Sequence, residues 1–187
     1  MKNLKDYILV IENAIPSFFC DEIVTYYEVS DEWNDAKIGG NPEQANEEEC
    51  SSIDKSKRNC TEIYLTESIF EKHLFKIGKN CLKRYLIKHP DARTNVGRGE
   101  AFSILKYEPD GFYKEHIDAD PMAPRVLSLS IVLNDEFTGG EFCFSDGNYK
   151  INLKKGSAIM FPSNFMYKHQ VLPVKSGTRY SIVTWFN

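Results

Sequence analysis

Residues 157–186 read SAIMFPSNFMYKHQVLPVKSGTRYSIVTWF, and this stretch gives the clearest indication of the fold. It contains three short segments rich in β-branched and aromatic residues. Pro162 and the pair Ser176-Gly177, whose residue types favour turns, lie between them. Such segments are typical of short strands joined by tight connections. The stretch therefore predicts three consecutive β-strands.

The same pattern extends back to residue 101. Five further segments have strand-like composition, and turn sequences such as Pro109-Asp110-Gly111 separate them. They are AFSILKY, GFYKEHID, VLSLSIVLN, EFCFS and YKINLKK. Eight short strands between residues 101 and 187 predict a mainly β (α+β) fold, a double-stranded β-helix of the jelly-roll or cupin-like type.

The first 100 residues show a different periodicity. Residues 7–16 predict a strand and a turn, and residues 18–28 predict an amphipathic helix. Apolar residues then recur at spacings of 4, 3, 4 and 4 from Phe70 to Tyr85, which predicts a second helix that Pro90 ends. We expect these helices to flank the jelly roll.

Residues 30–60 are polar and acidic, with Gly39, Gly40 and Pro42 as helix and strand breakers. This composition predicts a long, mobile surface loop, and loops of this length are often lids over a site. A chain of 187 residues is long enough for one hydrophobic core. We therefore expect one domain over residues 1–187, in which residues 1–100 support a jelly roll at residues 101–187.

Composition argues against several classes of protein. The 23 Lys and Arg residues are outnumbered by 27 Asp and Glu, and no basic run is long enough to follow a phosphate backbone, so we expect no nucleic-acid partner. The apolar stretch at residues 7–11 is too short for a secretory signal or a membrane span. The five cysteines are scattered without a C-x-x-C pair, which indicates free thiols in a reducing compartment. We expect a cytoplasmic protein without a membrane partner; the sequence leaves its oligomeric state unknown.

The segment YKEHIDADP, residues 113–121, places His116 two positions before Asp118. On an extended strand these side chains project from the same face. Such a pair is more often part of a solvated edge than of a metal site. His169, in a strand near the other end of the predicted barrel, offers a third ligand, although alone it is better explained as a surface or core histidine.

Two histidines and one carboxylate on a rigid scaffold form the facial triad that suits non-haem Fe(II). Zinc would more typically take histidines or thiolates in a tetrahedron. On the last strand, Arg179 and Ser181 share one face with Val183 and Trp185, so we expect the guanidinium to point inward. It would meet either an internal acidic residue or the carboxylate of a bound ligand, held in fork geometry with help from Ser181.

Three segments together resemble the Fe(II)- and 2-oxoglutarate-dependent oxygenases, and among them the prolyl 4-hydroxylase-like family. They are YEPDGFYKEHID (107–118), GGEFCF (139–144) and FPSNFMYKHQVLPVKSGTRYSIVTWF (161–186). NAIPSFFCDEI (13–23) is similar to the family's entry segment and first helix, and KSKRNC (55–60) to its strand after a mobile substrate loop.

The resemblance implies a dioxygenase that uses Fe(II), 2-oxoglutarate and O2, with ascorbate as an additional reductant, and releases succinate and CO2. It implies that His116, Asp118 and His169 bind iron. Arg179 would hold the distal carboxylate of 2-oxoglutarate, and Tyr107 would also contact this cosubstrate. The implied reaction is hydroxylation of a prolyl residue in a protein or peptide.

Tyr113, Arg125 and Trp185 match family positions near the target proline. Each also has a structural explanation, as core packing, a surface charge and an apolar filler respectively. The predicted strand VLSLSIVLN departs from the family pattern: where the family has a threonine or tyrosine near the cosubstrate, it offers Ser128 and Ser130. Either Ser181 or Ser130 would then assist Arg179. The alternatives are the same chemistry on another residue or a small molecule, and a cupin-like binding barrel without turnover.

Overall fold

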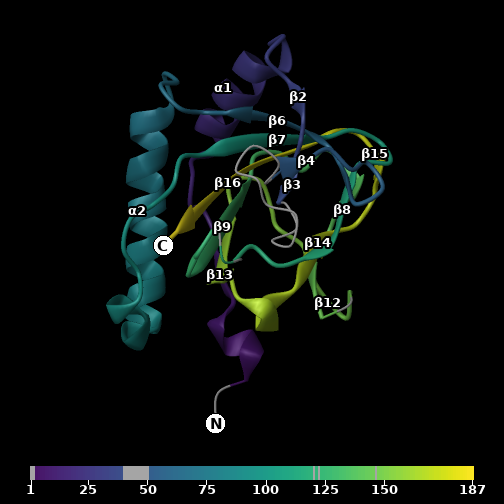
Figure 1. Ribbon diagram of the computed structural model, residues 1–187. Helices are drawn as coiled ribbons and strands as arrows, with labels where there is room; N and C mark the ends of the chain where they lie inside the picture. Colours follow the sequence, from purple (N-terminus) through teal and green to yellow (C-terminus); the bar gives the residue numbers. More distant parts are fainter. Residues whose placement is uncertain (1–2, 40–50, 120, 122, 146) are drawn as a thin grey trace.

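The computed structural model describes residues 3–39, 51–119, 121, 123–145 and 147–187. Two antiparallel sheets form its centre (Figure 1). The larger has the order β1 (Leu9–Ile11), β13 (Ala158–Pro162), β9 (Leu127–Val132), β16 (Arg179–Phe186), β7 (Ser103–Tyr107), β6 (Thr61–Tyr64) and β2 (Asn34–Asp35). The smaller has the order β12 (Tyr149–Ile151), β11 (Phe142–Phe144), β14 (His169–Val171), β8 (Phe112–His116) and β5 (Arg58–Asn59).

Short elements complete the chain. Two strand pairs lie outside the main sheets, β10 (Thr138–Gly139) with β15 (Val174–Ser176) and β3 (Ile38–Gly39) with β4 (Ser51–Ser52). The described residues also contain the 3-10 helices η1 (Leu4–Tyr7), η3 (Pro90–Thr94) and η4 (Phe165–Tyr167). The mainly β jelly roll is therefore confirmed, and all eight strands predicted after residue 101 are present.

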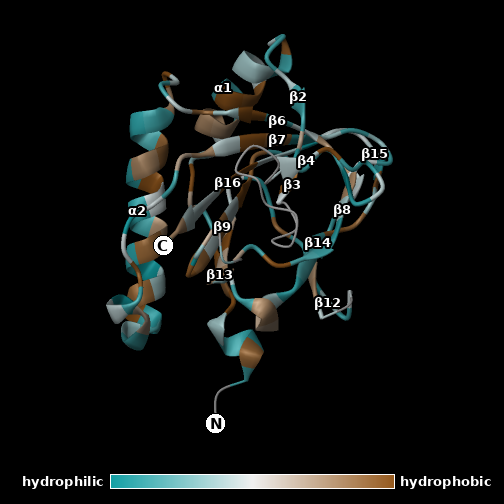
Figure 2. Ribbon diagram, in the orientation of Figure 1, coloured by the Kyte–Doolittle hydropathy of each residue, from teal (hydrophilic) through white to brown (hydrophobic). Residues whose placement is uncertain are grey.

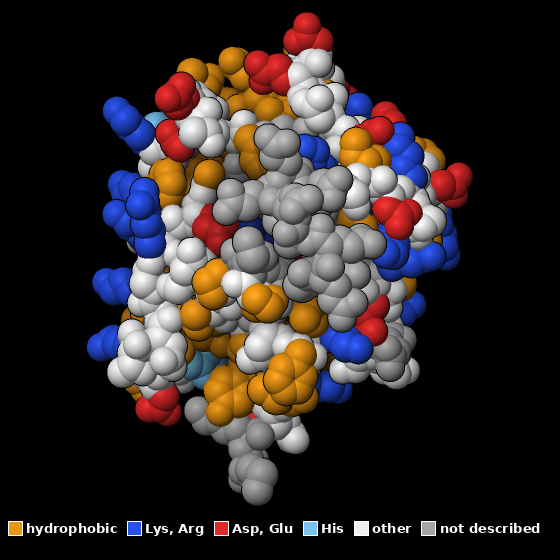
Figure 3. Space-filling model, in the orientation of Figure 1, with side chains coloured by type: hydrophobic (Ala, Val, Ile, Leu, Met, Phe, Trp, Pro, Cys, Tyr) orange, Lys and Arg blue, Asp and Glu red, His pale blue; other side chains and the backbone are white. Residues whose placement is uncertain are grey.

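Two helices, α1 (Ser17–Glu28) and α2 (Glu71–Lys88), cover the outer face of the larger sheet. Leu74 and Tyr85 of α2 are fully buried against sheet residues such as Ile104 and Ile182. Figure 2 shows the corresponding brown surfaces on the helix and on the strands beside it. The opposite face of α2 is charged, and Lys and Arg side chains form a blue row over it in Figure 3. Each buried Leu or Ile stabilises this layer by about 1.5–3 kcal/mol.

Strand β16 shows how one sheet serves two purposes. Tyr180, Ile182 and Phe186 face the helices and belong to the core between helices and sheet. The alternate residues, which include Arg179, line a cavity between the two sheets. Because alternate side chains point to opposite sides of the strand, one face of β16 packs in the core and the other face lines the cavity.

The first half of the chain corrects one prediction. Residues 30–60 are not simply a surface loop, because β2, β3, β4 and β5 lie within this range and Ala36 is buried. These segments are mainly polar and show no alternation of apolar residues, so their pattern did not predict strands there; pairing with neighbouring strands holds them extended. Residues 40–50 of the lid predicted at residues 30–60 lie outside the described residues, so the lid stays a prediction. Four cysteines, Cys20, Cys60, Cys81 and Cys143, are free and buried, as expected for reduced thiols.

Candidate active site

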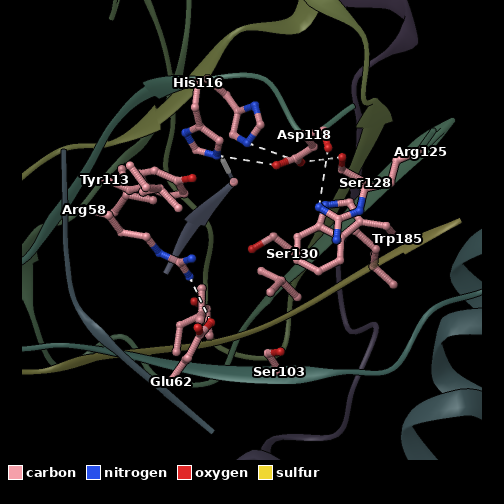
Figure 4. A pocket seen from close by; sticks show the side chains of 18 of the residues that line it. Arg58, Glu62, Ser103, Tyr113, His116, Asp118, Arg125, Ser128, Ser130 and Trp185 are labelled. Carbon is pink, nitrogen blue, oxygen red and sulfur yellow. Dashed lines mark hydrogen bonds and ion pairs between the residues drawn. The ribbon is translucent and has the colours of Figure 1, made fainter. Parts of the chain in front are cut away.

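The cavity between the two sheets has a volume of about 380 Å³, and Figure 4 shows side chains that line it. Inward residues of β7, β9 and β16 form its floor, and β8, β14 and the segment after β8 form the opposite wall. It collects every site residue predicted from the sequence: Tyr107, Tyr113, His116, Asp118, Arg125, His169, Arg179, Ser181 and Trp185. Residues 78 positions apart along the chain therefore share one chamber.

His116 and His169 are directly opposite each other on the paired strands β8 and β14. Asp118 lies between them: its carboxylate oxygens are 3.5 Å from the Nε2 atom of each ring. One ligand atom from each of the three side chains lies within 4.8 Å of the others. The structure therefore brings together the three side chains that the sequence predicts as metal ligands.

One local detail differs from the prediction. Strand β8 ends at His116, and Asp118 lies on a bend beyond the strand. Its side chain reaches the histidines because the chain turns there, and not because of the two-residue period of a strand. The carboxylate therefore depends on other groups for its orientation.

The two rings have defined tautomers. The Nδ1 atom of His116 is 2.9 Å from the carbonyl oxygen of Lys114, and that of His169 is 3.0 Å from the carbonyl oxygen of Tyr167. A carbonyl can only accept, so each Nδ1 carries the hydrogen and donates it. Each Nε2 lone pair is then free to bind a metal, which is the usual arrangement of histidine ligands.

The ionisation states also suit a cation. Burial lowers the pKa of His169 to about 4, so this ring is neutral near pH 7. Burial by itself raises the pKa of Asp118, but His169, His116 and the hydrogen bond from Ser128 together hold that pKa well below its usual range. Two imidazoles and an ionised carboxylate are the donor set that ferrous iron takes in facial-triad sites. The residues present therefore fit a ferrous ion.

Arg179 is the largest fully buried side chain, with 2% of its surface exposed. Its Nη1 donates to the hydroxyl of Ser181 at 2.8 Å, and its guanidinium carbon lies 5.3 Å from the centre of the Tyr107 ring. Within the described part of the chain, no carboxylate lies within 4 Å of it. The internal ion pair considered from sequence is thus absent there, and a buried cation faces the cavity without an anion.

The strand register explains this arrangement. Tyr107 of β7 is the cross-strand partner of Arg179, and Ser181 lies two residues further along the same face. Of the two serines considered as helpers of Arg179, only Ser181 contacts it; Ser130 lies on β9 opposite Val183.

The three residues expected near a substrate lie at the wall of the cavity. Tyr113 stacks on His116 with ring centres 3.5 Å apart. The guanidinium of Arg125 lies 3.6 Å from the centre of the Trp185 ring and forms a two-pronged ion pair with Glu100. Each of these side chains packs against neighbours and also borders the cavity, and a role toward a substrate stays a prediction.

Sequence reasoning placed Ser128 near the cosubstrate but missed its contact with Asp118, and it missed other contacts in and beside the cavity. The hydroxyls of Ser128 and Ser163 are hydrogen-bonded, and Ser128 also donates to Asp118. Glu100 forms an ion pair that orients Arg125. Arg58 forms an ion pair with Glu62 at 3.4 Å. The inward period of β9 could have indicated Ser128. No local pattern marks Ser163 or Glu100, because turns and sheet register bring them to the site.

Comparison with known proteins agrees with this geometry. The family model described as the 2OG-Fe(II) oxygenase superfamily matches residues 102–187. Residues 102–187, which make up slightly less than half of the chain, are therefore similar to this superfamily. These residues supply all the predicted metal ligands and Arg179.

Two curated relatives carry hydroxylase names. A PKHD-type hydroxylase of Acaryochloris marina is 33% identical over 115 residues, which are 57% of this chain and 52% of the relative. A putative prolyl 4-hydroxylase of Acanthamoeba polyphaga mimivirus is 25% identical over 156 residues, 73% of this chain and 61% of the relative. The chain thus spans between half and two thirds of the length of these relatives.

The fold as a whole also has a solved counterpart. The prolyl hydroxylase of Trichoplax adhaerens, solved with a hypoxia inducible factor peptide fragment, superposes with a TM-score of 0.72 at 16% identity. The match covers 97% of this chain and 83% of that chain. This likeness extends the shared fold to the helices of the first 100 residues. None of the helices in the described residues is both long and apolar enough to span a membrane.

Proposed function

We propose that this protein is an Fe(II)- and 2-oxoglutarate-dependent dioxygenase that hydroxylates a protein or peptide, at a prolyl residue. The observation that carries the proposal is the buried guanidinium of Arg179, which has no carboxylate within 4 Å among the described residues and lies in the same cavity as the His116, Asp118 and His169 cluster. A metal site alone would fit many functions. A metal site that shares its chamber with an unpaired cation requires a small anionic ligand next to the metal.

The overall reaction is balanced. One O2 and one 2-oxoglutarate are consumed, one oxygen atom enters a C–H bond of the substrate, and the other enters succinate as CO2 is released. Bound ferrous iron would supply the activation of oxygen, and ascorbate would serve as an additional reductant. His116, Asp118 and His169 would hold the iron through three ligand atoms and leave positions for other ligands.

The side chains around the metal site have separate tasks. Arg179 binds the distal carboxylate of 2-oxoglutarate, and Ser181 orients the guanidinium through the 2.8 Å hydrogen bond. Tyr107, buried beside the same guanidinium, borders the cosubstrate. The apolar layer around these groups keeps water out and strengthens the charge interaction.

The substrate proposal rests on the names of the relatives and on the side chains at the cavity wall. The curated relatives are named PKHD-type hydroxylase and putative prolyl 4-hydroxylase, and the solved counterpart holds a peptide. The flat rings of Tyr113 and Trp185 border the cavity, and Arg125 lies across the Trp185 ring. Aromatic faces of this kind suit the apolar ring of proline, and the guanidinium suits a peptide carbonyl.

The test is turnover with a peptide mixture. Purified protein is incubated with Fe(II), 2-oxoglutarate, ascorbate and proline-containing peptides, and succinate and peptide masses are measured together. We expect succinate and the gain of one oxygen on a prolyl residue, and neither with His116→Ala. Oxygen on another residue would replace the prolyl assignment. Succinate without peptide modification would indicate a small-molecule substrate, and no succinate from any candidate would leave the cupin-like binding barrel.

A further inference from the structure

The orientation of Asp118 depends on two serines that no sequence pattern linked to it. Because Asp118 lies beyond the end of β8, sheet hydrogen bonds do not hold its backbone on both sides. The hydroxyl of Ser128 is 2.6 Å from the Asp118 Oδ2 atom, and the hydroxyl of Ser163 is 2.8 Å from that of Ser128. Figure 4 shows the Ser128 hydroxyl directed at the carboxylate.

The donors in this chain of hydrogen bonds follow from chemistry. An ionised carboxylate can only accept, so the Ser128 hydroxyl donates its single hydrogen to Asp118. Ser128 then has no hydrogen left for Ser163, and Ser163 must be the donor in their contact. The relay runs from Ser163 to Ser128 to the carboxylate. Charge-assisted and coupled hydrogen bonds of this kind are stronger than isolated neutral ones.

Ser163 also holds the Asp118 segment through its backbone. Its carbonyl accepts a hydrogen bond of 3.0 Å from the amide of Ala119, the residue after Asp118. Its amide donates to the carbonyl of Val126, next to β9, also at 3.0 Å. Ser128 and Ser163 are 3% and 1% exposed, so water does not replace these bonds. The side chain and the backbone of Asp118 are therefore tied to one structural unit.

We propose that Ser128 and Ser163 are positioning residues for the metal-binding carboxylate. The relay donates to Oδ2, which also lies 3.5 Å from the Nε2 atom of His169, and it holds the carboxylate in one rotamer. Oδ1, which lies 3.5 Å from the Nε2 atom of His116, then stays free to bind the metal. This inference rests on the proposed function, because it assigns Asp118 to a metal. It goes beyond the ligand set by naming the groups that hold one ligand in place.

The same strand contains a matched control. Ser130 lies two residues from Ser128 on the same inward face and is 5% exposed. In the described part of the chain its hydroxyl has no side-chain hydrogen bond, and Figure 4 shows it directed away from Asp118. Replacing either serine by alanine removes the same atoms from the same sheet face, but only one replacement breaks the relay.

The experiment measures binding of Mn(II) alone to metal-free protein, by the electron paramagnetic resonance signal of the free ion. We expect Ser128→Ala to weaken binding about 10- to 100-fold, as is typical for loss of a partner of a metal ligand. Ser163→Ala should weaken it less, because Ser128 keeps its bond to Asp118. Ser130→Ala should stay within about twofold of the unaltered protein, since it breaks no bond to a ligand.

Two further measurements distinguish loss of the hydrogen bond to Asp118 from loss of the folded state. Circular dichroism of the metal-free variants establishes that each is folded, and Ser128→Thr, which keeps the hydroxyl, should recover most of the affinity. Equal Mn(II) affinity for Ser128→Ala and Ser130→Ala would overturn the relay and leave the proposed function intact. Absence of Mn(II) binding by the unaltered protein would instead overturn the proposed function, and the relay with it.

Discussion

Replacement of Arg179 by methionine tests whether its guanidinium binds a ligand or only stabilises the fold. Methionine has a similar length and no charge, so it fills the same space without needing an anion. A structural arginine paired to an internal carboxylate would be costly to remove, by about 3–5 kcal/mol, because its partner would be left buried and charged. Arg179 has no such partner within 4 Å in the described residues.

The expected change in stability is therefore small. The variant loses one hydrogen bond of a charged group to Ser181, worth about 1.5–3 kcal/mol, and one contact with the Tyr107 ring, worth about 0.5–2 kcal/mol. It also avoids the penalty of burying a cation, which is several kcal/mol. These terms oppose each other and are similar in size. We expect the free energy of unfolding of the metal-free variant to stay within about 2 kcal/mol of the unaltered value.

The expected change in cosubstrate binding is large. A guanidinium that grips a carboxylate in fork geometry forms two charge-assisted hydrogen bonds, each worth about 1.5–3 kcal/mol. Loss of about 3–5 kcal/mol corresponds to a rise in Kd for 2-oxoglutarate of at least about 100-fold. Arg179→Lys keeps the charge but loses the fork, so its Kd should rise about tenfold, between the two extremes.

The assay combines urea unfolding of metal-free protein with calorimetric titration of 2-oxoglutarate into protein loaded with Mn(II). The reasoning predicts nearly unchanged unfolding together with lost binding for Arg179→Met. The opposite pattern, a loss of more than about 3 kcal/mol in stability with unchanged affinity for 2-oxoglutarate, would refute it and assign Arg179 a structural role.

Three further predictions concern the metal ligands and the cavity wall. Burial lowers the pKa of His169 to about 4 from an unfolded value near 6.5, so the unfolded state binds more protons than the folded state between these pH values. The free energy of unfolding of the metal-free protein should therefore fall by about 2 kcal/mol from pH 7 to pH 5. Urea unfolding of His169→Gln at each pH should show a smaller fall. Arg125→Gln, which breaks the ion pair with Glu100 and the stacking on Trp185, should raise KM for a peptide substrate about tenfold; an equally large rise in Kd for Mn(II) would contradict a role confined to the cavity wall. Mn(II) at 100 times its Kd should stabilise the protein by about 2.7 kcal/mol in thermal unfolding, and Asp118→Ala should lose most of this gain.

Sequence alone was enough for the jelly roll and for most of the metal site. Strand periods, turn residues and the spacing of His116 and Asp118 are local features. His169 and Arg179 were candidates from their positions in predicted strands, and the resemblance implied their roles. The prediction for residues 30–60 was partly wrong because two-residue strands such as β2 and β5 are too short to show a period.

What the sequence determined by itself was which residue types face inward, because alternation along a strand is a property of each segment. Only the tertiary structure decided which inward groups meet. Arg179 hydrogen-bonds to Ser181 and not to Ser130, and no carboxylate lies within 4 Å of its guanidinium among the described residues. Asp118 accepts a hydrogen bond from Ser128, which in turn contacts Ser163. Those pairings follow from the register between strands and from the bend after β8. Register is set by the packing of whole sheets, so no local pattern of residues encodes it.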